Sequence, residues 1–232
     1  MLVLAGAGNA LSQVLLTDSF DGSVIDASKW QALAPLSDSS MSVSDGKAVF
    51  FQRGILITQQ NLPSSYIVEG RFAFTGGLHD NLHINLRTDG TLTQDWFDFS
   101  NNVYVQFSRR SGANGDGTGT YNVALRSYPH GLWANDFTFV NDVYYDFKIT
   151  DTGNRITVFL NDLQVASLAT DWPTGSGSGN KIGLENRGYV PWWPTYDNQV
   201  KLDYITISVP EPSSLSLLLA GGAVALARRR KL

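Results

Sequence analysis

The chain has 232 residues and a formal net charge of −4, and it contains no cysteine. This length fits one large domain better than two, and the lack of cysteine excludes a thiol site. From Pro210 onward the chain carries four basic residues and one acidic residue, so 13 basic residues stand against 20 acidic ones in the rest. An acidic body without a basic stripe excludes nucleic acid as a partner.

The first residues are apolar and include Ala5, Ala7 and Ala10, the small residues that a signal-peptide cleavage site needs. No lysine or arginine precedes them, although a secretory signal begins with a positive region. We interpret residues 1–13 as the remnant of a signal peptide whose start lies upstream. The alternative is a mature segment that runs into the first strand.

The body, residues 14–208, reads as short strands separated by turns. Residues 26–30 form a short helical turn that places Trp30 on the core. In residues 66–75 apolar and polar side chains alternate, which indicates a sheet with one dry face. The other strands expected in the first half are 15–22, which ends in a turn, 47–51 and 54–58.

Three later segments repeat this alternation, around Ile84, Val105 and Val123. If their apolar sides are buried, their opposite sides form one polar face. That face would carry His83, Asn85, Arg87, Tyr104, Gln106, Asn122 and Arg126.

The second half contains the clearest unit, a three-strand meander. Residues 145–150, 155–160 and 163–168 are strands, joined by turns at 151–154 and at Asn161-Asp162. Residues 181–186 and 199–209 are the closing strands. Strands at short, regular spacing with Gly-rich turns predict an all-β, antiparallel jelly-roll sandwich.

Several of these segments resemble concanavalin A-like jelly rolls, the lectin, glucanase and laminin-G group. The resemblance spans most of residues 15–208 and implies the fold more than any activity. It is carried by Phe20-Asp21-Gly22 with Ser28-Lys29-Trp30, by 152–162, by 181–186, and by 196–198 with 200–205.

Planar polar groups and a tyrosine on a sheet suit a sugar, whose hydroxyls need donors and acceptors and whose C–H faces stack on rings. Trp133 and the pair Trp192-Trp193 lie in segments rich in Pro and Gly, where exposed rings serve as stacking platforms. The alternative is a solvated face and tryptophans that cover the end of the sandwich. The predicted carbohydrate site consists of Asn85, Arg87, Tyr104, Gln106, Arg126, Trp133, Trp192 and Trp193.

A glycosidase is the competing hypothesis. Family-16-type enzymes carry two glutamates on one strand in the pattern Glu-x-Asp-x-x-Glu, and this chain lacks the pattern. Glu69 and Glu185 are isolated, and Asp95 with Asp98 would be the other carboxylate pair. Since two carboxyl groups must flank the bond, we predict a non-catalytic protein with no catalytic residue.

Metal signals are sparse, and no cofactor is predicted beyond a structural calcium ion. Asp203 on the last strand and Asp21 near the first occupy positions similar to those that hold Ca²⁺ in some jelly rolls. Carboxylates and backbone carbonyls are suitable hard ligands. Turn aspartates that hydrogen-bond to the backbone are the alternative.

The C-terminal stretch, residues 209–232, has three parts in a fixed order. Pro210-Glu211-Pro212 ends the last strand, because proline removes a backbone donor. An apolar run, 215–227, follows, and Arg228, Arg229, Arg230 and Lys231 come next. A basic block of this kind holds the end of a membrane segment in the cytoplasm.

This stretch resembles the PEP-CTERM sorting signal of exopolysaccharide-producing Gram-negative bacteria. The resemblance implies export, a precursor anchored in the inner membrane by a C-terminal helix, recognition by an exosortase, and transfer to the cell surface or extracellular matrix. A plain membrane anchor and a core helix are the alternatives. The predicted function is a sorted surface or matrix protein that binds extracellular polysaccharide; a glycosidase and a structural protein without a ligand are the competing hypotheses.

Overall fold

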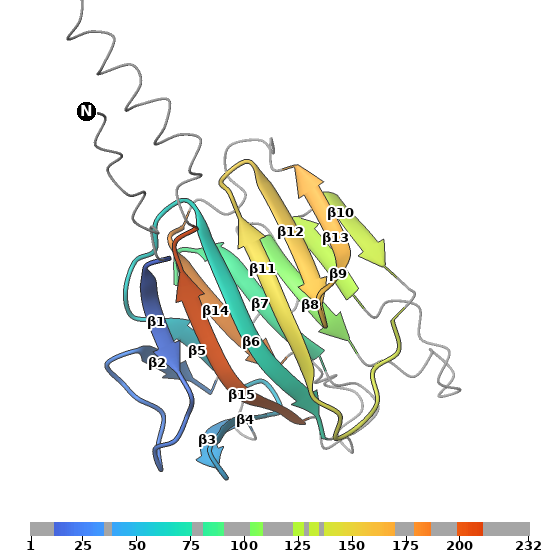
Figure 1. Cartoon of the computed structure of the whole chain (residues 1–232). Helices are drawn as coiled ribbons and strands as arrows, with labels where there is room; N and C mark the ends of the chain where they lie inside the picture. Colours follow the sequence, from blue (N-terminus) through green and yellow to red (C-terminus); the bar gives the residue numbers. More distant parts are fainter. Residues whose placement is uncertain are drawn as a thin grey trace, which may run out of the picture.

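The computed structural model describes residues 12–34, 39–75, 81–90, 103–108, 123–127, 130–134, 137–169, 179–186 and 199–210. These residues form an all-β sandwich of two antiparallel sheets (Figure 1). In this part of the chain no helix is long and apolar enough to span a bilayer. The expected C-terminal membrane helix and the signal-peptide remnant, up to residue 11, lie outside the described residues.

Sheet A lies in front in Figure 1 and has eight described strands. Its order is β13-β12-β11-β6-β15-β4-β3, and β1 pairs with the second half of β15. The strands are β1 (Val14–Asp18), β3 (Ser40–Ser44), β4 (Lys47–Phe51), β6 (Tyr66–Phe74), β11 (Tyr145–Asp151), β12 (Arg155–Leu160), β13 (Leu163–Ala169) and β15 (Gln199–Ser208).

Sheet B lies behind it and has seven described strands in the order β10-β9-β8-β7-β14-β5-β2. They are β2 (Trp30–Leu33), β5 (Ile55–Thr58), β7 (Asn81–Thr88), β8 (Val103–Ser108), β9 (Val123–Ser127), β10 (His130–Ala134) and β14 (Lys181–Asn186). The predicted antiparallel sandwich and the 145–168 meander are confirmed. Strands β2, β3 and β10 were not predicted from the sequence.

The core lies between the sheets and is rich in aromatic rings. Phe72 of sheet A stacks on Phe107 of sheet B, with centroids 5.1 Å apart and planes at 25°. Tyr145 and Phe139 extend the cluster, with an edge-on contact at 5.0 Å. Gly70 leaves room for the Phe147 ring of this cluster, because a Cβ at position 70 would lie 2.6 Å from that ring. Offset and edge-on ring pairs of this kind add to the hydrophobic gain of burial.

The predicted helical turn before β2 is present and buries Trp30. The amides of Lys29 and Trp30 both donate to the Asp26 carbonyl at 3.0 Å. Trp30 is 1% exposed, and its indole N–H donates to the Asp18 carboxylate at 2.7 Å. The same carboxylate accepts the Phe20 amide at 3.0 Å, so Asp18 joins the end of β1 to the start of β2.

Candidate functional site

The predicted polar face is the side of sheet B that points away from the core. Strand register places its residues in two rows across the sheet. One row runs Glu185, His83, Gln106, Ala124, and the backbone of Trp133 on edge strand β10 continues it. The other row runs Gly183, Asn85, Tyr104, Arg126. The expected burial of the opposite side is confirmed, because Ile84, Leu86, Val103, Val105, Val123 and Leu125 belong to the core.

Most side chains of this face are buried. Tyr104 and Asn85 are each 2% exposed, and the His83 ring stacks on Tyr104 with centroids 4.9 Å apart and planes at 12°. Gln106 is half-buried and donates to the Asn81 side chain at 2.9 Å. Of the described members, Gln106 is therefore the one most able to meet a ligand, while Tyr104 and Asn85 support the face from within.

Arg87 does not lie with Asn85 on this face, and here the alternation was misleading. Thr88 pairs with Lys181 and Asn85 with Gly183, so Leu86 and Arg87 face a single residue of β14. Arg87 has φ +54°, and this β-bulge redirects its side chain. Its guanidinium forms a bidentate ion pair with Asp151 of sheet A, at 2.7 Å for Nε. That carboxylate raises the pKa of Arg87.

A buried ion pair lies at the end of the first row. Arg53 Nε donates to Glu185 Oε1 at 2.8 Å, and both side chains are 2% exposed. Arg53 follows Gln52, whose φ of +52° makes the chain leave β4 in sheet A for β5 in sheet B. In the sequence, Arg53 lies between the two expected strands 47–51 and 54–58, and no role was predicted for it. Its position between two apolar strands was the signal for a buried cation.

Other predicted ligand residues lie in part or wholly outside the described structure. The backbones of Arg126 and Trp133 lie on β9 and β10 at the register positions given above. Trp192 and Trp193 fall outside the described residues, as do Glu211, Pro212, Arg228, Arg229 and Arg230 of the sorting stretch.

The residues of the predicted calcium site have other partners. Asp203 accepts a hydrogen bond from Lys47 at 2.6 Å and lies 3.8 Å from Arg71. Asp21 accepts a hydrogen bond from Ser19. The described residues contain no group of three or more His, Asp or Glu that could hold a metal. Two protein cations already neutralise Asp203, which does not fit a calcium ion there; a calcium titration followed by thermal unfolding would decide the prediction.

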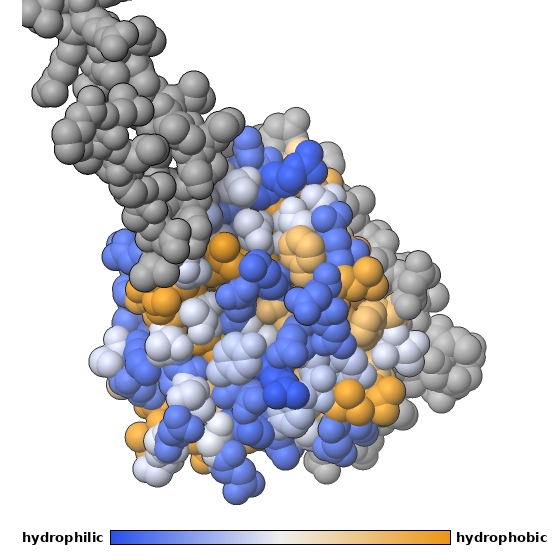
Figure 2. Space-filling model, in the orientation of Figure 1, coloured by the Kyte–Doolittle hydropathy of each residue, from blue (hydrophilic) through white to orange (hydrophobic). Residues whose placement is uncertain are grey.

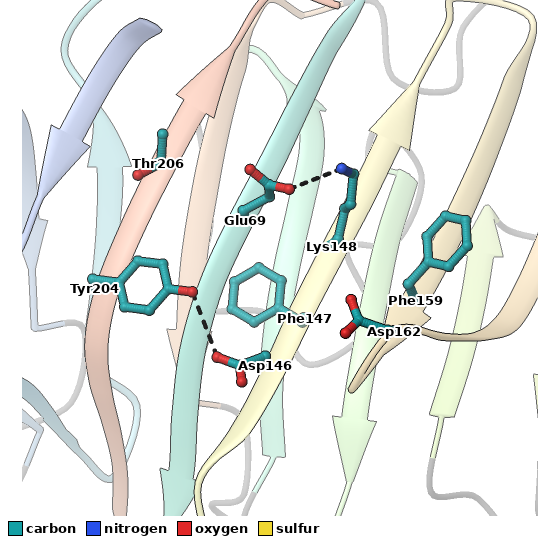
Figure 3. A pocket seen from close by; sticks show the side chains of 8 residues that line it. All are labelled: Glu69, Asp146, Phe147, Lys148, Phe159, Asp162, Tyr204 and Thr206. Atoms are coloured by element: carbon teal, nitrogen blue, oxygen red, sulfur yellow. Dashed lines mark hydrogen bonds and ion pairs between the residues drawn. The ribbon is translucent and has the colours of Figure 1, made fainter.

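The outer face of sheet A, which is mostly hydrophilic in Figure 2, carries a groove of about 410 Å³. We call it the sheet A groove. It is lined by Glu69, Asp146, Phe147, Lys148, Phe159, Asp162, Tyr204 and Thr206 (Figure 3). The alternation in residues 66–75 predicted an outward polar side for this strand. Nothing in it predicted that four strands would bring these residues together.

Two pairs organise the groove. Lys148 Nζ lies 2.9 Å from Glu69 Oε1, and the Tyr204 hydroxyl donates to Asp146 at 3.5 Å. Burial, and secondarily the Asp146 charge, raises the pKa of Tyr204, so its hydroxyl stays protonated at neutral pH. Asp162 sits in the tight β12–β13 turn with φ +64° and has no ion-pair partner among the described residues.

The sorting stretch begins where the sheet ends. Ser208 at the end of β15 pairs with Val14 on one side and Ile67 on the other. The Val209 amide then donates to the Gln13 carbonyl at 2.9 Å, and Pro210 follows. The body therefore leaves no spacer before the Pro-Glu-Pro motif, and β1 starts at the same end of the sandwich (Figure 1).

Comparison with solved structures identifies the fold class. A family 16 glycosyl hydrolase from Mycobacterium smegmatis matches with a TM-score of 0.57 at 14% identity, covering 84% of this chain and 100% of that one. The β-glucanase of Bacillus licheniformis matches with 0.57 at 12%, covering 85% and 98%. A glycoside hydrolase from Mycobacterium thermorestibile gives 0.60 at 12%, covering 83% and 99%. The body is thus a concanavalin A-like jelly roll, and at these identities the likeness concerns the fold alone.

The particular kind of protein follows from the other end of the chain. Residues 208–231 match the PEP-CTERM protein-sorting motif, which confirms the resemblance seen in the sequence. No curated protein matches the chain. The protein is therefore exported and sorted to the cell envelope through processing by an exosortase.

Proposed function

We propose that the jelly-roll body binds extracellular polysaccharide without cleaving it, as a surface or matrix component of a Gram-negative bacterium. The observation that carries this proposal is the polar face of sheet B. It combines the His83–Tyr104 stack with amide side chains that both donate and accept hydrogen bonds. Gln106 would contact the sugar, and the buried members would hold it in place.

The solved neighbours support a glycan as the ligand class. Their names describe a β-glucanase and family 16 glycosyl hydrolases, which act on glycans. Strand register places the backbone of Trp133 opposite Ala124, in the row that contains Gln106. Rings beside amide groups are what a pyranose needs, because its C–H face stacks while its hydroxyls pair.

The distribution of carboxylates supports binding over hydrolysis. Glycosidases hold two carboxyl groups roughly 5–10 Å apart around the scissile bond. Among the described strands of sheet B, Glu185 is the only carboxylate, and Arg53 holds it in a buried ion pair. Glu69 lies on sheet A with Lys148. Asp95 and Asp98 lie outside the described residues, so a turnover assay is part of the test.

The test is binding of the full-length protein to a panel of neutral bacterial polysaccharides by affinity electrophoresis and calorimetry. Gln106→Ala should weaken binding about threefold to tenfold, the value of one hydrogen bond. Gln164→Ala, on the exposed edge strand β13 of sheet A, is the matched control and should bind normally. Trp192→Ala/Trp193→Ala tests the predicted loop platform.

Release of reducing sugar by the protein, lost in a Glu185, Asp95 or Asp98 variant, would instead establish a glycosidase. If the full panel shows neither binding nor turnover, the proposal fails and a structural matrix protein remains. Normal binding by Gln106→Ala would remove the polar face from the site.

A further inference from the structure

The sheet A groove has the shape of a site for a chain-like ligand. It crosses four consecutive strands, β15, β6, β11 and β12. Three strand spacings of roughly 4.8 Å make it about 14 Å across. Tyr204 stands at one end and Phe159 at the other, and polar groups lie between them (Figure 3). Two rings at this separation can stack on different sugar units of one oligosaccharide.

The strand register fixes the relative positions of the residues that line the groove. Thr206, Glu69, Lys148 and Phe159 are successive cross-strand partners, so they share one row on the outer face. Asp146 lies beside this row, 3.5 Å from the Tyr204 hydroxyl and 3.7 Å from the Arg71 guanidinium. The donors and acceptors of the groove are therefore fixed by the sheet itself, which lowers the ordering cost of binding.

The charge of the groove selects among glycans. Three carboxylates, those of Glu69, Asp146 and Asp162, line the groove with the ammonium group of Lys148, and the Arg71 guanidinium lies beside them. Lys148 lies 2.9 Å from Glu69 and Arg71 lies 3.7 Å from Asp146, so the three carboxylates still outnumber the two cations, and Asp162 is the one without an ion-pair partner among the described residues. A polyuronate would meet this charge and that of an acidic body, so repulsion disfavours it.

We propose that the sheet A groove binds a glycan that carries free amino groups, a polymer containing deacetylated hexosamine. Tyr204 and Phe159 stack on the C–H faces of two sugar units. Asp146 and Asp162 accept charge-assisted hydrogen bonds from protonated amines. This site is separate from the polar face of sheet B and takes a different class of ligand.

The test uses the full-length protein and three hexasaccharides: fully deacetylated chitosan, its N-acetylated form, and oligogalacturonate. Calorimetry at about pH 5.5 keeps the carboxylates ionised. The deacetylated form should bind at least tenfold more tightly than the other two. Its affinity should fall as ionic strength rises from about 0.01 to 0.15 M, since exposed charges are screened.

Variants then locate the site. Asp146→Asn/Asp162→Asn should weaken binding about fivefold or more. The control Asp45→Asn/Asp142→Asn removes the same charge from turn residues that do not line the groove and should bind normally. Tyr204→Leu should weaken binding, whereas Tyr204→Phe, which keeps the ring, should retain most of it.

Three results would overturn the proposal: equal binding of the acetylated and deacetylated chains, equal loss in the control pair, or no binding of the deacetylated chain. Gln106→Ala separates this site from the proposed function, because it should leave binding of the deacetylated hexasaccharide unchanged. Loss of that binding in Gln106→Ala would place the ligand on sheet B and refute the assignment.

Discussion

The two glutamates of the body form ion pairs of nearly the same length in opposite surroundings, which allows a sharp prediction. Glu185 lies 2.8 Å from Arg53 with both side chains 2% exposed, whereas Glu69 lies 2.9 Å from Lys148 with 40% and 46% exposure. Glu185→Gln keeps the shape of the side chain and removes its charge, so the buried Arg53 guanidinium loses the carboxylate that lies 2.8 Å from its Nε. The free energy of unfolding should fall by about 3–5 kcal/mol.

This loss is a large share of the roughly 5–15 kcal/mol that stabilises a domain. Glu69→Gln is the control and should cost at most about 1 kcal/mol, because an exposed pair gains little. Urea unfolding followed by tryptophan fluorescence measures both, and the Glu185 variant should shift the midpoint by more than about 1 M. If Glu185→Gln unfolds at the wild-type midpoint, the pair is not structural, and Glu185 becomes a functional carboxylate whose removal costs no stability.

Three further outcomes are expected. Asp151→Asn should destabilise the protein by about 2–4 kcal/mol, because it leaves the half-buried Arg87 guanidinium without its bidentate partner and frees the bulge; an unchanged unfolding midpoint in urea would contradict this. Burial, and after it the Asp151 charge, raises the pKa of Tyr66. As the pH rises, the unfolded chain therefore loses the Tyr66 hydroxyl proton before the folded chain does. The contribution of this group to the free energy of unfolding is complete below about pH 10 and falls above it. Tyr66→Phe should lessen this fall by up to about 1.4 kcal/mol per pH unit in thermal melts. A flexible eight-residue linker inserted between Val209 and Pro210 should speed processing in the native host, read as the ratio of precursor to mature protein on pulse-chase; an unchanged ratio would show that the end of β15 does not hinder the exosortase.

Local patterns predicted most of the strands because each pattern is set by neighbouring residues. The alternation appears in the structure as alternating burial from Tyr66 to Phe72, and Asn161-Asp162 forms the expected two-residue turn with positive φ at both positions. The helical turn before Trp30 is likewise set by a nearby residue, because the Asp26 carbonyl accepts the amides of Lys29 and Trp30.

Arg87, whose face was predicted wrongly, shows that a local pattern does not contain information on long-range strand register. Its sequence context, His83-x-Asn85-x-Arg87, continues a perfect period of two. The bulge depends on how β7 registers against β14, almost 100 residues later in the chain, and on the Asp151 carboxylate of the other sheet. The sheet A groove is equally long-range, since Tyr204 and Phe159 come to line the same groove only through the two strands between theirs.

Strand β15 connects these features physically. Its middle lines the sheet A groove through Tyr204 and Thr206, and its end carries the sorting motif. Ser208 has a paired strand on each edge, so an enzyme that needs an extended, unpaired substrate cannot take up residues before Pro210 without opening the pairs with Val14 and Ile67. Proline itself ends the ladder, because it has no amide to donate. Processing can therefore proceed on a folded body only if recognition is confined to Pro210 and the residues beyond it.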